Sequence, residues 1–63
     1  MNIRKQAILY LKQNGYFLKR NGSKHDVYFN PKHNSMITLK RHDFDETDFR
    51  YIRKEIEHYR KEK

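Results

Sequence analysis

Apolar residues recur along this chain with two different periods, and the change of period separates helical from extended segments. Ile3, Ala7 and Leu11 follow one another at four-residue steps, the spacing that gathers apolar side chains on one face of a helix. This stripe predicts a helix over residues 2–14. Gly15 follows it directly and suits the left-handed conformation that ends many helices.

Three short segments rich in β-branched and aromatic residues follow, and turn residues separate them. They predict strands over residues 16–20, 25–30 and 36–40. Asn21-Gly22, between the first two segments, is the strongest short turn signal in the chain. Because the connections are short, we expect the strands to form an antiparallel sheet.

A second helical pattern occupies the C-terminal part of the chain. Apolar side chains recur there every three or four residues, at Phe49, Ile52, Ile56 and Tyr59. Asp45 precedes the pattern and is a favourable N-cap residue, which predicts a helix over residues 46–60.

The predicted order is helix, three strands, helix. We therefore expect one α+β domain, α-β-β-β-α, spanning residues 1–63, with both helices on one face of a three-stranded antiparallel sheet. The other sheet face and the loops remain available for function. A chain of this length has no room for a deep cofactor cleft, and we expect no cofactor.

Charge narrows the choice of partner. Fifteen Lys and Arg against eight Asp and Glu give a net charge of +7, and the sequence pI is near 9.9. Such a field attracts polyanions, of which nucleic acid is the usual one. An acidic protein or an acidic membrane surface would also be attracted by this charge. Small proteins are, in addition, often basic for solubility alone.

Two absences in the sequence exclude other classes. No cysteine is present, so disulfides and thiolate zinc sites are excluded. The chain has neither the apolar run of a signal peptide nor one long enough to span a membrane, so the cytoplasm is the expected location.

The candidate chemistry gathers at the first turn. His25 stands at the start of the second strand, and an imidazole can take up and return a proton near neutral pH. In the cleavage of a phosphodiester, Arg20 and Lys24 would hold the scissile phosphate, and Gly22 and Ser23 would offer backbone N–H groups to it. By composition alone this evidence is weak, because a surface histidine beside a turn is usually neutral in function.

A family resemblance sharpens this interpretation. Residues 14–31 read NGYFLKRNGSKHDVYFNP, and residues 37–42 read ITLKRH. Both segments resemble the HicA family of toxins, in which Gly-Ser is closely followed by His, then by an aromatic residue and often Pro. The resemblance extends over about residues 3–57. Where family members often carry prolines in the third strand, this chain has Thr38 and Lys40.

The resemblance implies a fold similar to the double-stranded-RNA-binding domain and an activity as a ribonuclease that cleaves messenger RNA. The essential histidine of the family falls on His25. A HicB-type antitoxin, expected to be acidic on its docking surface, would bind the protein and cover this site.

Further RNA contacts are expected from residues near His25. Among the aromatics, Tyr28 is retained as a candidate to contact RNA, whereas core packing is the expected role of most others. His42 is favoured as a structural residue rather than a catalytic one, and as an RNA contact it stays open. The candidate RNA-binding residues are Lys19, Arg20, Gly22, Ser23, Lys24, Tyr28, Lys40, Arg41 and His42.

Three hypotheses follow. The first is a metal-independent endoribonuclease toxin with His25 as general acid and base; neither His25 with Asp26 nor His42 with Asp43 and Asp45 has a recognised metal-ligand spacing. The second is a non-catalytic RNA-binding module of the same fold. The third is a protein-interaction module whose basic face docks an acidic partner.

Overall fold

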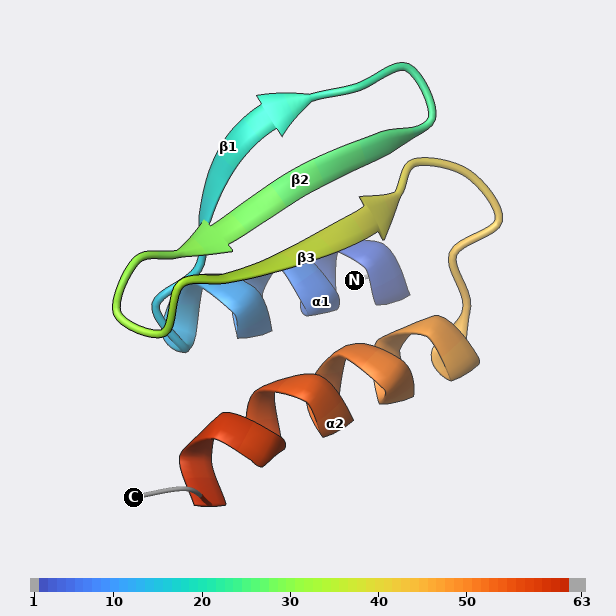
Figure 1. Ribbon diagram of the computed structural model, residues 1–63. Coiled ribbons are helices and arrows are strands. Elements are labelled where there is room, and N and C mark those ends of the chain that lie inside the picture. The colour runs from blue at the N-terminus through green and yellow to red at the C-terminus, as the bar shows by residue number, and fades with distance from the viewer. Residues whose placement is uncertain (1, 62–63) are drawn as a thin grey trace.

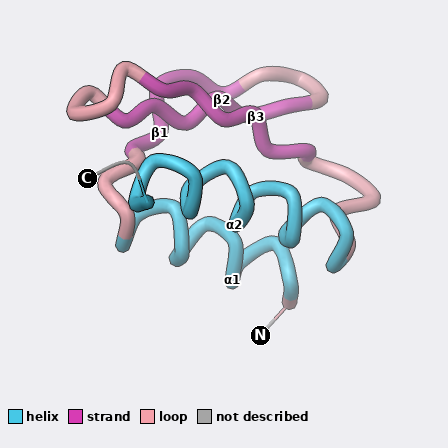
Figure 2. Tube along the Cα trace, turned by 60° about the horizontal axis from the view of Figure 1, so that its bottom comes forward, coloured by secondary structure: helices cyan, strands magenta, loops and turns pink. Residues whose placement is uncertain are grey.

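The computed structural model describes the backbone of residues 2–61 and the side chains of residues 2–58. The elements follow the predicted order α-β-β-β-α, as Figure 1 shows. They are α1 (Ile3–Gln13), β1 (Phe17–Asn21), β2 (His25–Asn30), β3 (Ser35–Lys40) and α2 (Glu46–Lys61). The two helices lie side by side on one face of the sheet (Figure 2), so the molecule has two layers. No helix in the described part of the chain is long and apolar enough to cross a membrane.

Helix α1 begins and ends as its flanking residues dictate. The side chain of Asn2 caps it by accepting a hydrogen bond from the Lys5 N–H at 2.8 Å. At the other end Gly15 has a φ of +87°, which a residue without Cβ adopts without strain. The Tyr16 N–H then donates back to the Leu11 carbonyl at 2.9 Å, closing a Schellman motif. The predicted strand start at Tyr16 was therefore one residue early.

The sheet has the order β1-β2-β3, with both neighbouring pairs antiparallel. Side chains alternate between its faces. In β3, Ile37 and Leu39 are buried against the helices, whereas Met36 and Thr38 are exposed on the opposite side. We call this uncovered side the open face. Its members from β2 and β3 are His25, Val27, Phe29, Met36, Thr38 and Lys40.

Strand β2 alternates with the reverse of the usual polarity. Its polar residues Asp26 and Asn30 are buried under the helices, while the apolar Val27 and Phe29 lie half-buried on the open face. The covered polar groups are satisfied locally. Asn30 donates from Nδ2 to the Asn14 carbonyl at 3.2 Å and accepts from the Lys32 N–H at 2.9 Å. No buried side-chain N or O atom in the described chain lacks a hydrogen-bond partner.

Helix α2 starts with a reciprocal capping box. The Asp48 N–H donates to the Asp45 carboxylate, and the Asp45 N–H donates to the Asp48 carboxylate, each at 3.1 Å. Phe44 and Phe49, on either side of this cap, both pack against the core, as expected of a hydrophobic staple. Tyr59, which the sequence placed on the same apolar stripe, lies outside the described side chains.

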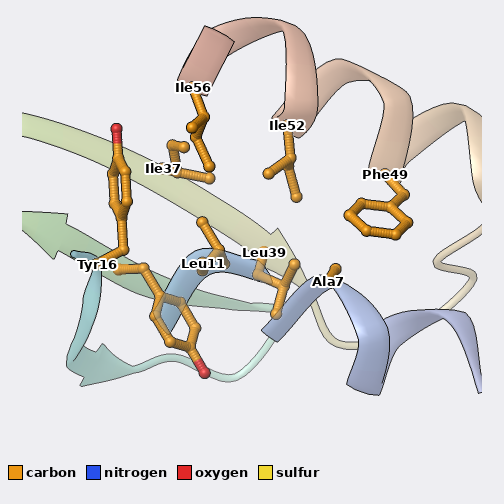
Figure 3. Packing of buried hydrophobic residues seen from close by; sticks show 9 residues of the cluster. Ala7, Leu11, Tyr16, Ile37, Leu39, Phe49, Ile52 and Ile56 are labelled. Carbon is orange, nitrogen blue, oxygen red and sulfur yellow. The ribbon is translucent and has the colours of Figure 1, made fainter. Parts of the chain in front are cut away.

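The core fills the space between the two layers. In Figure 3 the labelled side chains of α1, α2 and the sheet point toward one another. Ala7, Leu11 and Leu39 are fully buried at its centre, and Phe49 packs edge-on against Tyr10 with ring centroids 5.8 Å apart. The remaining buried members are Tyr16, Tyr28, Ile37, Ile52 and Ile56.

Candidate nucleic-acid interface

His25 is the first residue of β2 and is exposed. Its position in the antiparallel register puts it directly opposite Lys40, the last residue of β3. Cross-strand partners share a sheet face, so the side chains of His25 and Lys40 leave the sheet next to each other at one end of the open face. The sequence predicted both as site residues, His25 as catalytic and Lys40 as an RNA contact, and the strand register brings them together.

An open groove of about 440 Å³ runs from these two residues along β3 toward α2. His25 and Lys40 line it from the sheet. The groove therefore combines a histidine and a cation with hydrogen-bonding groups from a helix far away in sequence. Its lining from α2 includes Asp48, Tyr51, Ile52 and Glu55.

Lys40 is partly engaged by the helix. Its Nζ lies 3.3 Å from an Asp48 carboxylate oxygen, and both side chains remain partly exposed. The backbone N–H of Asp45, assisted by Lys40, holds the pKa of Asp48 below its ordinary value, against a smaller opposing effect of burial. Asp48 therefore stays ionised and anchors Lys40 beside His25.

The loop before His25 is held by a close backbone approach. A Cβ built on Gly22 would lie 2.3 Å from the His25 carbonyl oxygen, a separation that no side chain tolerates. Neither Asn21 nor Gly22 has a positive φ, so the connection is not the mirror-image turn that Asn-Gly often forms. Glycine is needed here for space rather than for conformational freedom.

A buried carboxylate holds the same loop from beneath. Asp26 is 6% exposed and accepts hydrogen bonds from Arg4 Nη2 at 2.6 Å and from Arg41 Nη1 at 3.2 Å. Arg41 Nη1 also donates to the Gly22 carbonyl at 3.1 Å, and Arg4 Nε donates to the Lys40 carbonyl at 2.8 Å. We call Asp26, Arg4 and Arg41 the arginine clamp. It ties α1, the Gly22 loop and the end of β3 together around His25.

The clamp changes the interpretation of two predicted residues. Arg41 was expected to contact RNA, but its guanidinium is turned toward Asp26 and Gly22, while its side chain stays 43% exposed. Tyr28 was also expected to contact RNA, and this is wrong. It lies on the covered face and is 4% exposed, so its ring has no surface on which a base could stack.

The other predicted contacts lie around the open face. Ser23 and Lys24 are exposed in the loop, and His42 is exposed in the turn after β3, outside the lining of the groove. Lys19 and Arg20 lie on β1, where a bulge between Leu18 and Arg20 interrupts the register. Arg20 pairs with an open-face residue, Val27.

Sequence reasoning missed the clamp and the α2 side of the groove. Asp26 was weighed only as a metal ligand beside His25, and Arg4 was not among the candidate site residues. The one sequence signal for a buried ion pair is an aspartate within a predicted strand, in a chain that carries arginines elsewhere. Nothing in the sequence indicated that Tyr51 and Glu55 would line a groove with His25.

No group of three or more His, Cys, Asp or Glu residues is clustered for metal binding in the part of the chain that the structure describes. His25 and Asp26 lie on opposite faces of the sheet, so the two side chains do not point toward a common metal ion. Comparisons with protein-family models, with curated proteins and with solved structures found no match to this chain. Its chemistry must therefore be argued from the site itself.

Proposed function

We propose that this protein is a metal-independent endoribonuclease that cleaves messenger RNA in the cytoplasm, as the toxin of a HicA-like toxin–antitoxin pair. One observation carries the proposal: an exposed histidine stands beside a lysine at the mouth of an open groove on a strongly basic domain. The α-β-β-β-α order, which double-stranded-RNA-binding domains share, is consistent with it.

RNA supplies its own nucleophile, so few groups are needed. His25 takes the proton from a ribose 2′-hydroxyl, whose oxygen attacks the adjacent phosphorus. The bond from phosphorus to the 5′ oxygen breaks, and that oxygen takes up a proton from water, to which His25 afterwards returns the proton that it took. Lys40 stabilises the negative charge that grows on the phosphate oxygens. The products are a 2′,3′-cyclic phosphate and a 5′-hydroxyl end.

The test compares the purified protein with His25→Ala on a labelled single-stranded RNA in the presence of EDTA. We expect the variant to cleave about 10²–10⁴-fold more slowly, the usual contribution of a positioned acid–base group. His33→Ala, in the turn between β2 and β3 at the opposite end of the sheet, is the matched control and should cleave normally. Equal cleavage by the protein and His25→Ala would overturn the proposal.

The chemical route has a test of its own. A substrate with a single 2′-deoxy substitution at the cleaved position lacks the internal nucleophile. It should resist cleavage there, while neighbouring ribonucleotides remain unaffected. Continued cleavage at the deoxy position would instead indicate attack by water.

The partner in this proposal is a HicB-type antitoxin with an acidic docking surface. The net charge of +7 and the open position of His25 favour such a partner. The purified antitoxin should inhibit cleavage in equimolar amounts, and the inhibition should weaken as salt screens the opposite charges. A partner that binds without inhibiting would show that it does not cover the site.

A second candidate function is RNA binding without cleavage. The basic, partly aromatic open face favours it, because its rings and the cation Lys19 are groups that bind RNA without taking part in cleavage. RNA binding by the protein in the absence of any cleavage under all conditions would select this function.

A further inference from the structure

The open face carries a row of apolar side chains that the core does not use. Phe17 pairs with Phe29, and Phe29 pairs with Met36, so one side chain from each strand contributes to the row. Phe17 is 60% exposed and Met36 is 59% exposed. In a chain with a mean hydropathy of −1.28, a row of large apolar side chains that face solvent needs an explanation.

Cations flank this row, and carboxylates are absent from it. Lys19 Nζ lies 5.0 Å from the centroid of the Phe29 ring, and Arg20 lies opposite Val27 in the next row. His25 and Lys40 form the last row. The only carboxylate in the three strands is Asp26, which is buried on the covered face.

We propose that the open face binds single-stranded RNA, with a base stacked on Phe17 and the sugar–phosphate backbone held by Lys19 and Arg20. The strand residues of this face offer aromatic rings and cations but no carboxylate, which matches the two chemical features of an unpaired strand, flat bases and phosphates. Asp48 and Glu55 of α2 border the face only at its β3 edge, on the side away from Phe17 and Lys19. Duplex RNA does not fit it, because paired bases are stacked on one another and do not present their faces.

The geometry links this subsite to the groove. Phe29 and His25 are four residues apart on the same strand and face, a separation of about 13 Å at the usual rise of a β-strand. A strand with a base stacked on Phe17 would therefore run past Lys19 and Arg20 toward His25. The direction of this path rests on the proposed function, whereas binding at Phe17 does not.

The test measures the binding of a fluorescent, unstructured RNA whose 2′ positions are methylated, so that cleavage through the 2′-hydroxyl cannot occur. Phe17→Leu keeps an apolar side chain but removes the ring, and should weaken binding about tenfold. Phe17→Tyr keeps the ring and should restore binding. Leu9→Ala removes a 48% exposed apolar side chain from α1, in the other layer, and should bind normally.

Four results would overturn the inference. Three of them are unchanged binding by Phe17→Leu, an equal loss in Leu9→Ala, and equally tight binding of a duplex of the same sequence. A fourth is binding to vesicles of anionic lipid that depends on Phe17 when RNA binding does not, which would assign the face to a membrane surface. All variants should unfold at the wild-type temperature, because Phe17 and Leu9 lie outside the core cluster.

Failure of this inference is distinguishable from failure of the proposed ribonuclease. Cleavage that requires His25 but not Phe17 would leave the nuclease standing and remove the stacking subsite. Binding that requires Phe17 with no cleavage by any preparation would leave the subsite standing and remove the nuclease.

Discussion

A single buried carboxylate determines how the residues around His25 are held. Asp26 lies under the helices, yet it is stabilised because Arg4 and Arg41 both donate to it. The two arginines also bind backbone carbonyls at Lys40 and Gly22, the segments that flank the groove. Charged groups at this depth persist only with such partners. The clamp therefore holds in place the two backbone segments on either side of His25.

Asp26→Ala should destabilise the protein more than any exposed charge does. Both arginines would lose their partner, and we expect a loss of about 2–3 kcal/mol in the free energy of unfolding. In a domain of this size, that corresponds to a fall of roughly 10–20 °C in melting temperature. Glu57→Ala, which removes an exposed carboxylate from α2, should stay within about 0.5 kcal/mol of the wild type. Similar melting temperatures for the two variants would contradict the role of the clamp.

Gly22→Ala tests the close approach in the loop before His25. Its new Cβ cannot occupy a point 2.3 Å from the His25 carbonyl oxygen, so the loop must move. We expect a loss of about 1–3 kcal/mol in the free energy of unfolding, measured by urea denaturation, and slower RNA cleavage. Ser23→Ala, in the same loop but exposed, should unfold normally. Wild-type stability in Gly22→Ala would show that the loop adapts freely.

At the scale of an element, the N-terminus of α2 joins folding to the site. The capping box between Asp45 and Asp48 satisfies backbone N–H groups that the helix leaves unpaired. The same Asp48 carboxylate holds Lys40 against the groove. A change at this cap therefore acts on both the helix and the cation beside His25.

The lowered pKa of Asp48 predicts how this cap responds to acid. A carboxyl group with a lowered pKa in the folded state stabilises the fold above its unfolded value, 3.8, and this contribution is lost as pH falls through the folded value. Asp48→Asn should therefore melt below the wild type at pH 7, and the difference should shrink below about pH 4. Glu57→Gln is the control for a general charge effect. A difference that stays constant down to pH 2 would refute the linkage.

At the scale of the whole molecule, two layers divide the tasks. The helices and the covered sheet face hold the core, and the open face is left with cations and aromatic rings. In the proposed function, the net charge of +7 would attract RNA over a long range, and only residues on the open face would contact it.

Salt dependence tests which cations make contact. Lys19, Arg20, Lys24 and Lys40 lie on or beside the open face, and four phosphate contacts predict a slope of about −3 in a plot of log affinity against log salt. Lys19→Ala should reduce the steepness by about 0.7, the share of one contact to a single strand. Lys5→Ala, on α1, removes the same charge from the other layer and should leave the slope unchanged. Equal effects of the two variants would indicate non-specific attraction.

Local sequence was enough for the elements and their order. The caps at Asn2 and Asp45 and the glycine after α1 set the helix limits to within a residue, because the groups that end a helix are its sequence neighbours. The apolar stripes of both helices pointed to the core correctly for every member whose side chain is described. His25 was predicted as the leading candidate because residues 14–31 resemble a toxin family in which a histidine closely follows Gly-Ser, whereas its place beside a loop was weak evidence alone.

Tertiary structure decided which face of β2 is covered. Alternation by hydrophobicity would bury Val27 and Phe29, whereas the register with Ile37 and Leu39 buries Tyr28 and Asp26 instead. The reversal is stable because the polar groups it buries find partners far away in sequence, foremost the guanidinium of Arg4. It withdraws Tyr28 from the surface and leaves Phe29 on the open face. The pairing of His25 with Lys40 was decided in the same way, since a register joins residues that local sequence keeps apart.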